Sequence, residues 1–281
     1  MPTLDSPERP GPTAERKPCP TGIVLSGGGV RGVAHIGVLR ALLEHGIEPR
    51  CVAGVSAGAI VGALYAAGYS PHEMLRFFQT VEPLHFTHFA FAKPGFMDTA
   101  KLIPLFAPFF PENSFEALPR KLAVLATDML SGQPVIFDSG ELIRPVLASA
   151  SVPMIYSPTE INGRWYSDGG IADNFPAQLL AGSCERLLGV NVSPLRAVTH
   201  GELGSSLAVL ERALDIGMFQ QARAKFPLCD IVIQPEGLEG FGMFGTKHLQ
   251  SIETAGYEAA MARMPEILSV VGPGPRDAPG R

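Results

Sequence analysis

Short apolar runs alternate with longer segments of helical periodicity along most of this chain. The runs are rich in strand-forming residues, and we expect strands at residues 23–26, 51–55, 122–126, 134–137, 187–192 and 231–233. Helices are expected at residues 31–45, 57–67, 203–224 and 248–268, and Pro71 opens another. Strands that alternate with helices predict an α/β fold of three layers (α/β/α), in which a mostly parallel central sheet lies between two layers of helices.

The two ends of the chain differ in composition from the region between them. Residues 1–20 are rich in proline and charge, and we expect them to be a disordered tail, as we do residues 271–281. No break in composition divides the residues in between. A chain of 281 residues is long enough to bury a large core, so we expect one domain at residues 21–270.

The charge and hydropathy of the chain exclude several classes of function. The net charge is −5 and no dense patch of lysine and arginine is present, so we expect no nucleic-acid partner. Only 17% of the residues are charged, which favours an apolar substrate. The most hydrophobic window, residues 57–69, is shorter than the roughly 20 residues that a membrane-spanning helix needs. The amino-terminal residues lack the apolar segment of a secretory signal, so a cytoplasmic protein is expected.

The cysteines give no support to a metal or redox site. The chain has four cysteines, Cys19, Cys51, Cys184 and Cys229. They lie far apart in the sequence and form no C-x-x-C pair. We interpret them as isolated reduced thiols, and we expect neither a metal nor a cofactor.

The first strand runs into a glycine-rich loop in the sequence GIVLSGGGVRG, residues 22–32. The spacing of Gly27, Gly29 and Gly32 fits the dinucleotide fingerprint, in which backbone amides at a helix start hold a pyrophosphate. The same geometry would also hold the oxyanion of an acyl-transfer reaction. The loop alone therefore leaves two functions open.

The second strand ends in the sequence Gly54-Val55-Ser56-Ala57-Gly58, which has the pattern G-x-S-x-G. This pattern is typical of a sharp strand-to-helix turn that exposes a nucleophilic serine, and the flanking residues are small because chain and helix pass close by. A simpler interpretation makes Ser56 the N-cap of the next helix. A nucleotide-binding enzyme would carry an acidic residue at this strand end, and Glu48 precedes the strand, so the dinucleotide interpretation is disfavoured.

A serine nucleophile needs a base, and the histidines are weak candidates. His200 and His248 lie late in the chain without a supporting motif, and His35 is expected to pack within the first helix. His85 and His88 have a spacing that weakly suggests a metal pair, but no carboxylate lies near them in the sequence.

Asp168 is a better candidate for the base. It follows a strand expected at residues 164–166, after a hairpin at Asn162 and Gly163, and it precedes Gly169 and Gly170. A carboxylate at a strand end beside two glycines is sterically open on one side, as a base that receives a proton from a serine must be. A plain Asp-Gly turn would give the same pattern, and the same ambiguity holds for Asp128, Asp138 and Asp173.

Three motifs in this order resemble the patatin-like phospholipases, in particular their compact bacterial members: SGGGVRGVAHIGVLRAL, GVSAGAIVGALYAAG and DGGIADNFP. The connecting segments TDMLSGQPVIFDSG and ASASVPMIYSP are similar to that family as well, and the resemblance covers roughly residues 21–265. It implies a patatin-like fold and a lipid acyl hydrolase, such as a phospholipase A, lysophospholipase or carboxylesterase, with a Ser-Asp dyad.

The resemblance also implies roles for individual residues. Ser56 corresponds to the nucleophile and Asp168 to the base, while the elbow glycines Gly54 and Gly58 and the pair Gly169 and Gly170 complete the two motifs. The oxyanion loop corresponds to Gly27, Gly28, Gly29, Arg31 and Gly32. Arg31 would orient the loop, meet a lipid phosphate, or be a solvated helix residue. The implied reaction forms an acyl-enzyme that water hydrolyses; an acyltransferase with the same dyad and a non-catalytic regulatory protein are the alternatives.

A phenylalanine-rich segment at residues 84–110 lies outside these motifs. Its prolines and charges exclude a membrane-spanning helix. It would be a mobile lid, a surface that docks transiently on a membrane, or part of the core. We therefore expect a lipid or ester substrate and leave the oligomeric state open.

Overall fold

The computed structural model describes residues 18–81, 95, 97–238 and 248–272. The tails expected at residues 1–20 and 271–281 fall mostly outside the described residues, so the domain limits stay a prediction. Within the described residues, no helix is both long and apolar enough to cross a membrane.

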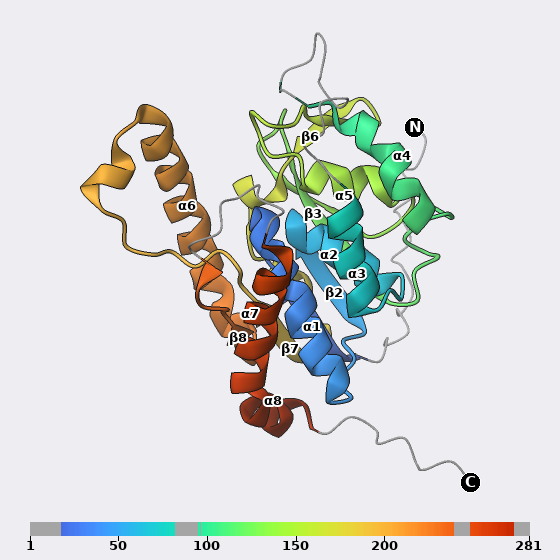
Figure 1. The fold of residues 1–281 in the computed structure, drawn as a ribbon. Coiled ribbons are helices and arrows are strands. Elements are labelled where there is room, and N and C mark those ends of the chain that lie inside the picture. The colour runs from blue at the N-terminus through green and yellow to red at the C-terminus, as the bar shows by residue number, and fades with distance from the viewer. Residues whose placement is uncertain (1–17, 82–94, 96, 239–247, 273–281) are drawn as a thin grey trace, which may run out of the picture.

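One mixed sheet of eight strands forms the centre of the fold (Figure 1). Its strands are β1 (Cys19–Leu25), β2 (Cys51–Val55), β3 (Lys121–Asp128), β4 (Pro134–Phe137), β5 (Thr159–Ile161), β6 (Arg164–Ser167), β7 (Cys184–Val190) and β8 (Ile231–Ile233). The order is β5-β6-β3-β2-β1-β7-β8, and β4 also pairs with β3. The run β3-β2-β1-β7-β8 is parallel, whereas β4, β5 and β6 pair antiparallel at one side.

Helices connect β1 to β2, β2 to β3 and β7 to β8, the parallel part of the sheet, as is typical of an α/β fold. The helices are α1 (Ala34–Glu44), α2 (Ala57–Ala66), α3 (Pro71–Thr80), α4 (Ile103–Phe106), α5 (Ile143–Ser149), α6 (Ser206–Lys225), α7 (Leu249–Ala262) and α8 (Met264–Val271). Figure 1 shows α1, α2 and α7 against one face of the sheet, with most of α6 extending away from the body. The α/β fold expected from the sequence is confirmed.

Both faces of the sheet are buried, which explains why its strands read as unbroken apolar runs. In β1, Ile23 and Leu25 belong to the large core beneath the helices, while Val24 belongs to a second core on the other face. That second core contains Phe175 and, from the carboxyl end of α6, Ala222. The sheet therefore lies between two covering layers.

Some elements differ from the sequence-based expectation for identifiable reasons. Strand β1 begins at Cys19, before the expected start at Ile23, because its first residues pair with β7. The helix expected at 248–268 is two helices that meet at Arg263, because Pro265 in the first turn of α8 lacks the N–H that a continuous helix needs. The short helix α5 was not expected, since Pro145 interrupts its pattern.

The parallel pairing of β1 and β2 brings the two motifs from the sequence to one edge of the sheet. Because β1 and β2 are parallel neighbours, the segments that follow Leu25 and Val55 leave the sheet at the same edge. These segments are the glycine-rich loop and the G-x-S-x-G turn. Strand β6, antiparallel to β3, brings Asp168 to that edge from the opposite direction.

Candidate active site

Ser56 lies on a strained turn between β2 and α2. Its φ of 54° and ψ of −124° are unusual for a residue with a side chain, and such strain is typical of functional sites. The flanking glycines permit the turn, since a Cβ on Gly54 would lie 2.5 Å from the carbonyl oxygen of Gly58, and a Cβ on Gly58 would lie 2.2 Å from that of Leu25. Both neighbours are backbone atoms, which cannot move aside cheaply. The turn therefore has the geometry of a nucleophile elbow.

The backbone of this turn is held by a buried serine from α5. The N–H of Ser56 donates to Oγ of Ser149 at 2.8 Å, and that hydroxyl donates in turn to the carbonyl of Leu125 in β3 at 2.6 Å. Ser149 thus links the strained turn to the sheet. Ser149 lies in the segment ASASVPMIYSP, which resembles the family, but nothing in its run of small residues indicates this particular role.

The side chain of Ser56 points to Asp168. Its hydroxyl donates to Oδ2 of the carboxylate at 2.6 Å, and both residues are buried. The other oxygen, Oδ1, accepts the N–H of Gly170 at 2.8 Å. The Asp168 backbone is fixed as well, because its N–H donates to the carbonyl of Ser151 and its carbonyl accepts the Thr127 hydroxyl. The structure thus brings the two expected residues together in hydrogen-bonding geometry.

Burial changes the acidity of the Asp168 carboxyl. Desolvation raises its pKa to about 6, against the opposing effect of hydrogen bonds from Ser56 and Gly170. A carboxylate with this pKa is ionised at neutral pH, and it accepts a proton more readily than an ordinary aspartate.

The glycine-rich loop lies directly beside Ser56. A Cβ on Gly27 would lie 3.2 Å from Cβ of Ser56, and Gly29 has a φ of 58° that favours glycine. Gly28 and Gly29 open the short 3-10 helix at Gly29–Val33, which leads into α1. Gly32 packs on α2, because a Cβ there would lie 2.4 Å from that of Ala57. The N–H of Gly28 makes no hydrogen bond within the described part of the chain.

Neighbouring side chains fix the carbonyl groups of this loop. Nε of Arg31 donates to the carbonyl of Gly28 at 3.3 Å, which orients the loop, one of the roles considered for this residue. The hydroxyl of Ser193 donates to the carbonyl of Gly27 at 2.8 Å. These two hydrogen bonds to the carbonyls of Gly27 and Gly28 stabilise the conformation of the loop.

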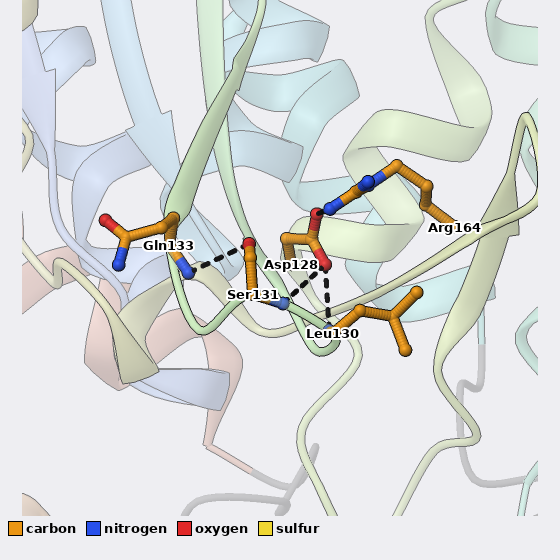
Figure 2. A network of polar contacts seen from close by, with 5 residues as sticks. All are labelled: Asp128, Leu130, Ser131, Gln133 and Arg164. Carbon is orange, nitrogen blue, oxygen red and sulfur yellow. Dashed lines mark hydrogen bonds and ion pairs between the residues drawn. The ribbon is translucent and has the colours of Figure 1, made fainter.

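Asp128 is one of the aspartates that share the ambiguity of Asp168 in the sequence, and in the structure its carboxylate has other partners. Figure 2 shows its carboxylate bound to Arg164 and to the turn amides of Leu130 and Ser131. Burial raises the pKa of Asp128, but these hydrogen bonds outweigh burial and hold the pKa below its usual value. Asp128 therefore stabilises the turn after β3, and its carboxylate is a poor proton acceptor.

The remaining candidates for the base are not placed beside Ser56 by any hydrogen bond or ion pair among the described residues. His35 packs within α1, as expected; its Nε2 lies 2.8 Å from the carbonyl of Ser26, and burial lowers its pKa to about 4. Asp173 accepts from the backbone of Phe175 and pairs with Lys225 at 2.5 Å. Asp138, His200 and His248 are exposed, while His85 and His88 lie outside the described residues.

Asn174 is a site residue that the sequence interpretation missed. It is buried, and its Oδ1 would lie 2.3 Å from a Cβ on Gly27 and 2.8 Å from one on Gly170. Its carboxamide thus lies between the glycine loop and the Asp168 turn. Neither Oδ1 nor Nδ2 has a hydrogen-bond partner among the described residues, which is costly for a buried amide. The sequence shows only an asparagine within DGGIADNFP.

An apolar cavity opens at Ser56. Its lining includes Gly29, Ile60 of α2, Phe77 of α3, Phe106 of α4 and Leu147 of α5. The cavity could therefore take a hydrocarbon chain whose reacting end lies at the serine.

Part of the phenylalanine-rich segment contributes to the cavity and to the core. Phe106 and Phe110 are buried, and the Phe77 and Phe106 rings meet edge to face with centroids 5.1 Å apart. Of the three roles predicted for this segment, packing in the core is confirmed for Phe106 and Phe110. Residues 84–94 and 96 lie outside the described residues, so the lid and the membrane-docking surface stay predictions.

Comparison with curated proteins finds relatives that are much longer than the matched region. An uncharacterized NTE family protein of Mycobacterium tuberculosis (strain ATCC 25618 / H37Rv) is 34% identical over 163 residues, which are 57% of this chain and 45% of that protein. Lysophospholipase NTE1 of Saccharomyces cerevisiae is 28% identical over 193 residues, which are 66% of this chain and 12% of the yeast protein. The chain thus spans about half the length of the bacterial relative and far less of the yeast one.

Comparison with solved structures supports the fold. The crystal structure of VipD from Legionella pneumophila matches with a TM-score of 0.51 and 14% identity, over 88% of this chain and 67% of VipD. At this identity the similarity concerns the fold alone. The family model described as patatin-like phospholipase matches residues 23–181, a span that holds the glycine loop, the elbow and Asp168. The chain is therefore a member of the patatin-like phospholipase family.

Proposed function

We propose that this protein is a serine lipid acyl hydrolase in which Ser56 and Asp168 form the catalytic dyad. The observation that carries the proposal is the 2.6 Å hydrogen bond from Oγ of Ser56, on its strained turn, to the buried carboxylate of Asp168. Among the described residues, this carboxylate is the group that accepts the serine proton. Membership of the patatin-like phospholipase family supports the same chemistry.

In the proposed reaction, Oγ of Ser56 attacks the ester carbonyl carbon while Asp168 takes the hydroxyl proton. The carbonyl oxygen becomes an oxyanion, which the backbone N–H groups of Gly28 and Gly29 bind. Collapse of the tetrahedral species expels the alcohol, which takes the proton from Asp168 and leaves an acyl-enzyme on Ser56. Water, deprotonated by Asp168, then attacks the acyl carbonyl, and the fatty acid leaves as the proton returns to Ser56.

Each part of the site contributes a recognisable share of the rate. A positioned general base is typically worth about 10²–10⁴. A single oxyanion donor is typically worth about 10²–10³.

The proposed substrate is an ester with an apolar acyl chain. The apolar cavity at Ser56, lined by Phe77, Phe78 and Phe106 among others, fits a hydrocarbon chain better than a polar one. One relative, from yeast, carries the name lysophospholipase. A lysophospholipid is therefore the first natural substrate to test.

A fluorophosphonate probe tests the nucleophile, and graded esters test the substrate class. Wild type should be labelled covalently, Ser56→Ala should not, and Ser205→Ala, at the cap of α6, should be labelled as wild type is. p-Nitrophenyl esters of increasing chain length should be hydrolysed faster as the chain fills the cavity. Absence of both labelling and hydrolysis would refute the hydrolase, whereas a preference for acetate over longer acyl groups would refute the lipid substrate alone.

A further inference from the structure

Three of the four cysteines, interpreted from the sequence as isolated thiols, form a cluster. Sγ of Cys19, Cys51 and Cys184 all lie within 4.8 Å of one another, although the residues are up to 165 positions apart. The isolated-thiol interpretation is therefore wrong for these three and stands only for Cys229. We call Cys19, Cys51 and Cys184 the thiol cluster.

The sheet order produces the thiol cluster. Each of its residues is the first of its strand, and β7, β1 and β2 are neighbours in the sheet. Cys19 is the register partner of Cys184, and Cys51 is that of Gly22. Gly22 leaves the space that the sulfurs occupy, because a Cβ there would lie 2.5 Å from Sγ of Cys184.

The thiol cluster is separate from the proposed dyad. It lies at the amino ends of the strands, whereas Ser56 follows the carboxyl end of β2. At about 3.3 Å per strand residue, roughly 16 Å separates Cys51 from Ser56. A ligand at the cluster would therefore not touch the ester-hydrolysing groups.

The environment of the cluster disfavours a role as a redox-active nucleophile. Burial, followed by hydrogen bonding and charge repulsion with Cys51, raises the pKa of Cys19 to about 11. Hydrogen bonding with Cys184 and burial raise the pKa of Cys51 further above its usual value. Reactive cysteines have the opposite property, a lowered pKa.

We propose that the thiol cluster is a binding site for a monovalent copper ion, held by Sγ of Cys19, Cys51 and Cys184. Metal–thiolate bonds of about 2.3 Å place the sulfurs of a trigonal site about 4 Å apart, close to the spacing already present. No fourth histidine, cysteine or carboxylate joins the group among the described residues. Zinc sites in proteins are almost always four-coordinate, whereas soft thiolates without further ligands suit Cu(I).

Binding is an exchange of protons for the metal without any change of oxidation state. Cu⁺ displaces the three thiol protons to solvent, and three Cu–S bonds replace three S–H bonds. The resulting centre carries a charge of −2. Lys121, the register partner of Cys51, carries a positive charge that would offset part of this charge. A bound ion would join the amino ends of three strands and so stabilise the sheet.

Anaerobic titration of the full-length reduced protein with Cu(I), against a coloured Cu(I) chelator, tests the site. Cys51→Ser and Cys184→Ser remove one ligand each from different strands, and Cys229→Ser is the matched control outside the cluster. Wild type and Cys229→Ser should each take one Cu(I) per chain and melt at a higher temperature with the ion than without it. Both cluster variants should bind at least tenfold more weakly and gain no such increase.

Three results would overturn the proposal. Equal Cu(I) affinity in wild type and in both cluster variants would show that other groups bind the ion. Displacement of Cu(I) by equimolar Zn(II) would show that the site does not prefer the softer ion. A wild-type mass two hydrogens lighter, with loss of two reactive thiols, would identify a disulfide in place of a metal site. Melting curves of the metal-free variants establish that each is folded.

Discussion

The hydroxyl of Ser56 donates a 2.6 Å hydrogen bond to Oδ2 of Asp168, a residue 112 positions further along the chain. The serine is held at a strained φ, and the carboxylate is buried and held by the N–H of Gly170. In the reaction that we propose, this arrangement would align the proton donor and the acceptor before the substrate binds, so that little reorganisation would remain for the reaction itself.

The first prediction concerns the two members of the pair. Asp168→Asn keeps the shape of the side chain but removes the base, so kcat/KM for a p-nitrophenyl ester should fall by about 10²–10⁴. Ser56→Ala should abolish fluorophosphonate labelling. Asp138→Asn, which changes an exposed aspartate, serves as the control and should be as active as wild type. Full activity in Asp168→Asn would assign the base to another group.

The pH profile of the reaction should report the pKa of Asp168. Burial raises this pKa to about 6, so the carboxylate that accepts the proton is lost as the pH falls through that value. We expect kcat/KM to be flat above about pH 7 and to decrease tenfold per pH unit well below pH 6. The measurement is initial rates of ester hydrolysis between pH 4.5 and 8.5, by titration of the released acid. A profile that stays flat down to pH 4.5 would contradict the assignment.

The burial of the Asp168 carboxylate should also make the wild type less stable at alkaline pH than the variant Asp168→Asn. The folded pKa of Asp168 is about 6, against 3.8 for the ordinary carboxyl, so the folded state binds the proton more tightly. The stability that proton binding by Asp168 adds to the folded state is therefore largest below pH 3.8, and it is lost as the pH rises through 6. At about 1.4 kcal/mol per pKa unit, the difference is roughly 2–3 kcal/mol.

Thermal and urea unfolding of Asp168→Asn test this stability difference. At pH 8 the variant should unfold at a higher temperature and higher urea concentration than wild type, although it is inactive. At pH 4 the gap should shrink below about 1 kcal/mol, because the wild-type carboxyl is then protonated in the folded state. A wild type more stable than Asp168→Asn at pH 8 would show that the hydrogen bonds of the carboxylate outweigh its burial.

Ser149 should support activity through the backbone of Ser56. Ser149→Ala leaves the N–H of Ser56 and the carbonyl of Leu125 without their partner, at a cost of about 1–3 kcal/mol in folding free energy. Because the strained turn then loses its anchor, kcat should fall roughly 10–100-fold with little change in KM. The control is Ser205→Ala, which removes the cap of α6 and should cost about 1 kcal/mol without loss of kcat. Equal kcat in the two variants would limit Ser149 to a role in stability.

Two glycine-to-alanine substitutions should have opposite effects on stability. In Gly58→Ala the new Cβ would lie 2.2 Å from the carbonyl oxygen of Leu25, so β1 or α2 must shift, at a cost of at least about 2 kcal/mol. In Gly217→Ala, within α6, no atom lies within 4 Å of the new Cβ. That variant should gain about 0.5–1 kcal/mol, because alanine favours the helix. Urea denaturation measures both; a stabilised Gly58→Ala would contradict the close packing at the elbow.

Local features were predictable because their causes lie within a few residues. The expected bounds of β2, β4 and β8 agree with the structure, since each is a compact apolar run between turn residues. The start of α3 agrees too, because Ser70 and Glu73 form a capping box around Pro71. The interrupted helix at Arg263 and the short α5 were not predicted, because periodicity alone does not fix where a proline ends or permits a helix.

The sequence by itself determined the glycine loop and the elbow, because close backbone approach and a positive φ demand glycines at fixed spacings around Ser56. The residues alone favoured Asp168 as the partner of the serine but left Asp128 open, and the family resemblance pointed to Asp168. Asp128 and Asp168 both follow strand residues and precede turns. The order of the strands places Asp128 against Arg164 and Asp168 against Ser56. The anchoring role of Ser149 and the meeting of three cysteines at the other edge have the same origin. These contacts join segments far apart in sequence, and only the packing of the whole sheet brings such segments together.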